Sequence, residues 1–172
     1  MKIMNKLQNR KEELKKNNKG FSLVELIIVI AIMAILVGVV GTQVIPYINK
    51  SKESKDFQIV SSFGTAAMTA YSSKADKITV PTPASGDSTI TFNLYASTAA
   101  DTTDEGILVA AIKELTYSTK TDVIGTNGKF KSTEGKKIDD IKITYNFTKK
   151  TITAQAVDSS DNAVLGAVVS DM

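Results

Sequence analysis

A run of apolar residues near the N-terminus constrains the fold of this chain most. Residues 21–45 read FSLVELIIVIAIMAILVGVVGTQVI and contain a single charged side chain, Glu25. As a helix rising roughly 1.5 Å per residue, this stretch is about 37 Å long, enough to cross a hydrocarbon core of about 30 Å. A secretory signal peptide has a shorter apolar region, followed by a small-residue cleavage site. The run therefore predicts a membrane-spanning helix.

Basic residues are concentrated in front of this run. Residues 1–20 carry seven basic and two acidic side chains, and the whole chain has a formal net charge of +3, so the remainder carries −2. Positive charge before a membrane helix holds the N-terminus in the cytoplasm and directs the C-terminal part outward. The only arginine, Arg10, lies in this stretch. We therefore interpret the basic balance as that of a leader, and we predict no specific nucleic-acid partner.

The composition also argues against several kinds of site. The chain contains no Cys and no His, which excludes disulfides, thiolate metal sites and imidazole ligands or bases. No Gly-rich phosphate loop, nucleophile elbow or zinc-ligand spacing occurs. We expect no catalytic site, no metal and no cofactor.

Two features suggest that the apolar run is more than an anchor. A carboxylate such as that of Glu25 costs up to a few kcal/mol in a membrane segment, so it usually marks a function. Small residues recur at spacings of three and four, which places them on one helical face where neighbouring helices can approach closely. These are Ala31, Ala34, Gly38 and Gly41.

Residues 19–27, KGFSLVELI, resemble the class III signal of type IV prepilins. The resemblance covers about the first 50 residues closely and the rest only in general layout. It implies that a prepilin peptidase removes the leader, residues 1–20, by cutting between Gly20 and Phe21. It further implies that Phe21 becomes N-methylphenylalanine and that Glu25 supports assembly of a filament.

The chemistry of these residues fits the implied roles. Gly20 lets an extended backbone enter a protease cleft without a side-chain clash. Cleavage creates an α-amine at Phe21, which we expect to pair with Glu25 of a neighbouring subunit. Both charges would then lie in a low-dielectric core, where an unpaired charge is costly, so the pairing sets the axial register of the subunits.

The chain departs from the family pattern in two places. Many pilins have a proline near the position of Thr42, whereas the nearest proline here is Pro46. Together with Gly38 and Gly41, Pro46 predicts a stretch that kinks or melts in the fibre. The absence of Cys removes the family's frequent disulfide loop, a feature that points to a Gram-positive bacterium.

The remaining sequence predicts an α+β head. Residues 46–75 form an amphipathic continuation of the helix, whose charged start, from Lys50 to Asp56, we expect to be solvated or between subunits. Residues 76–172 predict a connecting loop, a helix at 104–115 and a small antiparallel sheet. The strands are expected within 88–95 and at 141–147, 152–156 and 163–169. The fold class is thus α+β, the pilin fold, with a long N-terminal helix packed under the sheet.

Two groups of acidic residues in the head are candidates for a metal site or a catalytic pair. The turn at residues 158–162 carries oxygens that could bind Ca²⁺, but it lacks EF-hand spacing and is typical of a polar hairpin turn. Asp139 and Asp140 are adjacent in a strand, so they point to opposite faces and make a poor catalytic pair.

The resemblance implies a structural subunit of a type IV pilus that supports adhesion, surface motility or biofilm formation. The precursor is expected in the cytoplasmic membrane as a single-pass protein with its N-terminus inside, and the product in a cell-surface pilus. The implied partners are copies of the chain in a helical homopolymer, prepilin peptidase, and the assembly platform and its ATPases. Two alternatives remain: a pseudopilin of a type II secretion or competence system, and a membrane-anchored extracellular binding module.

Overall fold

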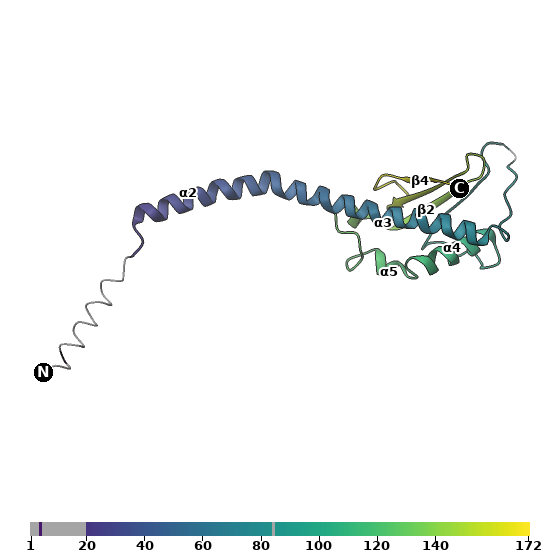
Figure 1. The fold of residues 1–172 in the computed structure, drawn as a ribbon, viewed down its shortest axis with the longest axis horizontal. Helices are drawn as coiled ribbons and strands as arrows, with labels where there is room; N and C mark the ends of the chain where they lie inside the picture. Colours follow the sequence, from purple (N-terminus) through teal and green to yellow (C-terminus); the bar gives the residue numbers. More distant parts are fainter. Residues whose placement is uncertain (1–3, 5–19, 84) are drawn as a thin grey trace. The chain divides into compact units, whose positions relative to one another are not determined.

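The computed structural model describes Met4, residues 20–83 and residues 85–172 (Figure 1). The predicted leader therefore lies outside the described residues except for Met4 and Gly20. The chain divides into two compact units, Met1–Ile45 and Pro46–Met172, and each is described by itself.

The N-terminal unit contains helix α2, Leu23–Val39, followed by a π-helical turn η1, Val40–Val44. Helix α3, Ile45–Lys74, follows without a non-helical residue. The resulting helix, Leu23–Lys74, is long and apolar enough, by length and composition, to cross a membrane. In the described chain, no residue of α2 is buried.

The π-helical turn lies directly before the proline. The N–H of Ile45 donates to the carbonyl of Val40, five residues back rather than four. Proline has no N–H to donate and its ring crowds the preceding turn, so an irregular turn at this place has a local cause in Pro46. The hydroxyl of Thr42 donates to the carbonyl of Gly38 at 3.0 Å. Melting of this stretch in a fibre stays a prediction.

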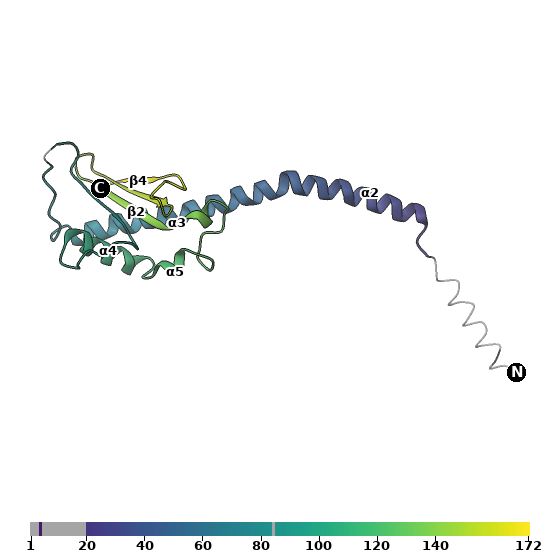
Figure 2. The same cartoon turned by 180° about the vertical axis from the view of Figure 1, so that it is seen from behind.

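The C-terminal unit is built around a four-stranded antiparallel sheet of order β1-β2-β3-β4. Its strands are β1 Thr89–Asn93, β2 Asp140–Asn146, β3 Thr151–Val157 and β4 Val168–Asp171. Between β1 and β2 the chain forms α4 Asp104–Leu115, α5 Lys120–Val123 and a 3₁₀ turn η2 Gly135–Lys137. Helix α3 lies along the sheet, with α4 and α5 beside it (Figure 1, Figure 2).

The core lies between α3 and the sheet. Alternation along β2 buries Ile143 and Tyr145, and the register places them opposite Ala154 and Ile152 of β3. Helix and sheet approach closely, because a Cβ added at Gly64 would lie only 3.6 Å from the Cβ of Ala154. The hydroxyl of Tyr145 donates to the carbonyl of Ala67 of α3 at 2.9 Å, which satisfies a buried polar group.

The structure confirms the α+β class, and a long N-terminal helix packed with a small antiparallel sheet fits the pilin fold. The expected fourth strand is partly wrong, since β4 begins at Val168 and residue 163 forms only an isolated bridge with Val157. The intervening segment turns toward α3 instead. There Leu165 is buried, and a Cβ added at Gly166 would lie 3.4 Å from the ring of Phe57. The short α5 and η2 were not predicted.

The expectation that Asp56 is solvated or lies between subunits is wrong. Its side chain is 1% exposed. Its carboxylate accepts the N–H groups of Lys131 at 2.9 Å and Ser132 at 2.8 Å, and the hydroxyl of Ser132. The loop before η2 crosses α3 here, and its N–H groups need acceptors that no neighbouring strand supplies.

A second side chain of α3 holds the same loop. The Oδ1 atom of Asn49 accepts the N–H of Thr133 at 2.9 Å and its hydroxyl at 3.0 Å. We call Asn49, Asp56, Ser132 and Thr133 the helix clasp. It ties residues more than 70 positions apart in the chain and fixes the loop on α3 near the start of the head.

Removing residues 1–45 is expected to give a soluble, folded monomer, because residues 46–172 contain their own hydrophobic core and the complete helix clasp. Circular dichroism during heating should show one cooperative transition, and sedimentation should show a monomer. Gross insolubility without cooperative melting would contradict this prediction.

Candidate processing and assembly site

The predicted cleavage bond lies in non-helical chain just before α2. Gly20 and Phe21 precede the helix, and Ser22 is its N-cap in an extended conformation, with φ −64° and ψ 141°. Phe21 is 89% exposed. A protease needs an extended, accessible backbone, and the Gly20–Phe21 bond offers one.

Glu25 closes the start of the helix. Its Oε2 atom accepts the N–H of Ser22 at 2.9 Å. A carboxylate at the third helical position satisfies an otherwise unpaired N–H and is favoured by the positive end of the helix dipole. In the single chain, therefore, the carboxylate of Glu25 has a partner within its own helix.

Ser22 is the residue of this site that sequence reasoning missed. The spacing Ser-x-x-Glu, from Ser22 to Glu25, is a known signature of a helix N-terminus and could have predicted the contact. The contact joins the carboxylate of Glu25 to the N–H of Ser22, the residue directly after Phe21.

The fold of the described chain does not itself require glycine at position 20. A Cβ added at Gly20 would meet no heavy atom of the described residues within 4 Å, and the same holds at Gly38 and Gly41. Any need for glycine at the junction must therefore come from the peptidase that binds it.

Replacing Gly20 by alanine is expected to slow cleavage strongly while leaving the fold and membrane insertion unchanged. Mass spectrometry of the chain from peptidase-positive cells should show accumulation of the uncut precursor. Gly38→Ala is the matched control, since it is the same substitution at another unpacked glycine and should be cut normally. Equal cleavage of both variants would show that the peptidase tolerates a side chain at position 20.

The surface of α2 is apolar on all sides. Its large aliphatic side chains are between 46% (Val39) and 72% (Leu23) exposed. Such an area is strongly unfavourable in water and must be covered by lipid or by other helices. Glu25 is the one charged residue in this helix.

The acidic pair of the head does not form a site. Asp140 is buried, and its two oxygens accept the N–H groups of Tyr95 at 2.9 Å and Ala96 at 2.8 Å. Asp139 instead pairs with Lys120 at 2.8 Å near the surface. The two carboxylates therefore stabilise different loops.

Within the turn at residues 158–162, the carboxylate of Asp158 accepts hydrogen bonds from other residues of the turn. Asp158 accepts the N–H groups of Ser160 and Asn162 at 2.8 and 3.0 Å. Three hydrogen bonds lower the pKa of Asp158 below its usual value. The largest effect comes from the N–H of Asn162, the next from the side chain of Asn162 and the third from the N–H of Ser160. Asp161 forms an ion pair with Lys142. Across residues 20–83 and 85–172, no group of three or more His, Cys, Asp or Glu could hold a metal ion.

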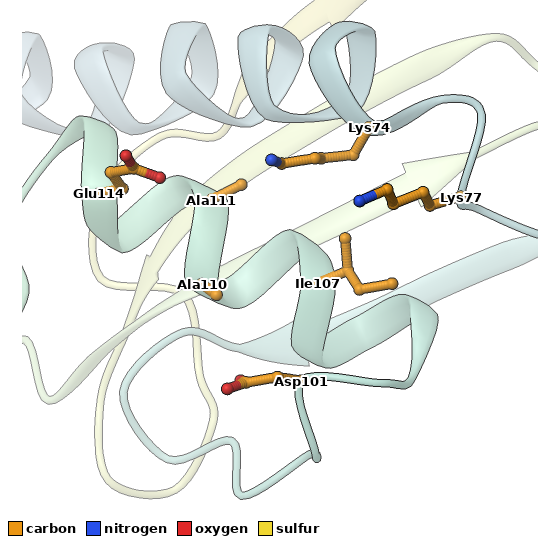
Figure 3. Close-up of a pocket in the computed structure, with 7 residues that line it drawn as sticks. All are labelled: Lys74, Lys77, Asp101, Ile107, Ala110, Ala111 and Glu114. Carbon is orange, nitrogen blue, oxygen red and sulfur yellow. The ribbon is translucent and has the colours of Figure 1, made fainter.

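A shallow groove lies between the end of α3 and α4 (Figure 3). Lys77 lies over Ile107 and Lys74 extends over Ala111, while Asp101 and Glu114 lie at other sides of the groove. The groove has a volume of about 270 Å³ and mixes both signs of charge, so its lining does not select one class of ligand.

Residues 15–41 match the protein family described as the prokaryotic N-terminal methylation motif. The match includes Gly20, Phe21 and Glu25 and supports a type IV pilin-like prepilin with a class III signal peptide. No curated protein and no solved structure matches the chain. The motif implies processing by prepilin peptidase and assembly into filaments, and it indicates a structural, pilin-like protein. With the apolar helix, it fits membrane anchoring of a precursor.

Proposed function

We propose that this type IV pilin-like precursor is the structural subunit of a type IV pilus. Prepilin peptidase cuts after Gly20 and methylates Phe21, and the helices of residues 21–45 then bundle into the filament core. One observation carries this proposal: the methylation motif at residues 15–41 directly precedes and enters a helix whose apolar surface is exposed on all sides. The chain acts by assembly and has no catalytic role.

Before assembly, the precursor resides in the cytoplasmic membrane as a single-pass protein with its N-terminus in the cytoplasm. The assembly platform and its ATPases then assemble many copies of the processed chain into a cell-surface pilus. Residues 46–172 form the pilus surface and serve adhesion, surface motility or biofilm formation.

Glu25 changes its partner during this process. In the single chain it accepts the N–H of Ser22. After cleavage, the new amine of Phe21 on a neighbouring subunit is a charged and therefore stronger partner. Inside a helix bundle an unpaired carboxylate or ammonium costs several kcal/mol, so only the axial register that pairs them is stable.

N-terminal sequencing and mass spectrometry of material sheared from cells test the proposal. The surface material is expected to consist of this chain beginning at N-methylated Phe21. An N-terminus still at Met1 in the membranes of peptidase-positive cells would refute the filament and favour a membrane-anchored binding module.

The methylation motif equally suits a pseudopilin of a type II secretion or competence system. Deleting the gene separates the two functions. Loss of long surface fibres is expected for a pilin, whereas loss of protein export or DNA uptake in cells without such fibres is expected for a pseudopilin.

A further inference from the structure

A basic pocket lies beside the helix clasp. Three lysines line it: Lys52 of α3, Lys131 of the clasped loop and Lys136 of η2. Its volume is about 650 Å³, and Gly125, Thr126 and Phe130 complete the lining. Among the described residues, no acidic side chain lines this pocket. We refer to it as the basic pocket.

The helix clasp assembles the basic pocket. Asp56, four residues after Lys52 on α3, accepts the N–H groups of Lys131 and Ser132. The hydroxyl of Ser132 in turn accepts the N–H of Gly135 at 2.8 Å, directly before Lys136. Lysines from distant parts of the chain are thereby held around one cavity.

Among the described residues, the lysines of the basic pocket have no acidic partner at the surface. The buried carboxylate of Asp56 offsets part of their charge, but that side chain is turned into the protein and is 1% exposed. Of the acidic residues next to these lysines in sequence, Glu53 lines a different hollow with Phe57, and Glu134 pairs with Lys137. In the described part of the protein, none of the three ammonium groups forms an ion pair. Residues 21–172 carry a net charge of −2, so the positive charge of this cluster is opposite in sign to the net charge of that segment.

The position of Lys52 along α3 relates the basic pocket to the membrane. Lys52 follows Ile45, where the apolar run ends, by about 10 Å of helix. The headgroup region extends roughly 5–8 Å beyond the hydrocarbon core on each side, and a lysine side chain reaches back toward it. When residues 21–45 span a bilayer, the side chain of Lys52 is therefore within reach of phospholipid phosphates.

We propose that the basic pocket binds the phosphate groups of anionic phospholipids while the precursor is stored in the membrane. Lysine ammonium groups bind phosphate as point charges, and basic groups near an anionic leaflet are attracted to it. Such binding holds the head against the leaflet until the subunit is extracted. The inference rests on the proposed function, because it requires residues 21–45 to lie in a bilayer.

Lysine acylation in nanodiscs tests this inference on the full chain. One set of discs contains phosphatidylcholine alone, and the other contains phosphatidylcholine with phosphatidylglycerol. Mass spectrometry is expected to show several-fold slower labelling of Lys52, Lys131 and Lys136 in the anionic discs, with recovery at high salt because the attraction is screened. Lys74 and Lys77, at the other end of α3, should react equally in both discs. Equal rates at all five lysines would overturn the inference alone, whereas failure of the chain to enter either disc would overturn the proposed function with it.

A third arm separates lipid from soluble phosphate. Inorganic phosphate is added to the neutral discs, and weak or no protection of the three lysines is expected. Protection as strong as that by phosphatidylglycerol would show that the pocket takes free phosphate and would overturn the lipid assignment.

Charge-matched variants test the same assignment by amide exchange. The triple variant Lys52→Gln, Lys131→Gln, Lys136→Gln is expected to lose the lipid-dependent slowing of exchange across residues 125–136. The control Lys74→Gln, Lys77→Gln, Lys150→Gln removes the same charge elsewhere and should keep it. Loss of the slowing in both variants would show a non-specific effect of net charge and would overturn a pocket-specific site.

Discussion

Replacing Glu25 by alanine is expected to reduce fibre yield by roughly tenfold or more, because in the proposed filament the amine of Phe21 would then be buried without a counter-charge, at a cost of several kcal/mol. Cleavage after Gly20 should continue, since the exposed, non-helical junction does not depend on the carboxylate. Quantitative blotting of sheared fibres against processed protein in the membrane measures both effects.

Glu25→Gln separates the two roles that the structure and the proposal give this side chain. Glutamine can still accept the N–H of Ser22 and cap the helix, but it carries no charge. If the pairing with Phe21 governs assembly, the glutamine variant should fail as the alanine variant does. Normal fibre yield from the glutamine variant would show that capping is what matters, and it would refute the pairing argument.

Replacing Asp56 by alanine is expected to destabilise the head by about 3 kcal/mol or more. The substitution leaves the buried N–H and hydroxyl groups of Ser132 and the partly buried N–H of Lys131 without their acceptor, and loss of a buried acceptor costs about 1–3 kcal/mol. Urea unfolding of residues 46–172 measures the change in the free energy of unfolding. If that fragment proves insoluble, the full chain in detergent serves instead.

Glu53→Ala is the matched control for Asp56→Ala. Glu53 is an exposed acidic residue on the same helix, one turn earlier, and its loss should change the free energy of unfolding by no more than about 0.5 kcal/mol. A similarly small effect of Asp56→Ala would show that the loop satisfies its N–H groups in another way. The helix clasp would then not be the reason for the burial of Asp56.

Local patterns were enough to predict most elements of this fold. The acidic first turn and apolar spacing predicted the helix Asp104–Leu115, and alternation of Ile141, Ile143 and Tyr145 predicted strand β2. The start of β4 was predicted wrongly, because the segment before it packs Leu165 against the protein interior instead of pairing with β3. A short apolar run does not reveal which of these two kinds of burial it adopts.

The helix clasp could not be predicted, for a different reason. Asp56 stands among lysines and a glutamate in a sequence that has the composition of a solvated surface. Its partners follow 75 and 76 positions later, and their contribution is mainly backbone N–H groups, which leave no mark on the sequence. The Ser22–Glu25 contact, in contrast, spans three residues and has a recognisable spacing.

The helix clasp leads to an expectation about how the subunit responds to pulling. Asn49 and Asp56 hold adjacent residues of one loop, so we expect a load applied along α3 to fall on both sets of bonds together. The π-helical turn before Pro46 has no such cross-link among its described hydrogen bonds. Under traction we expect that turn to extend first, which absorbs the strain outside the head and leaves the head folded.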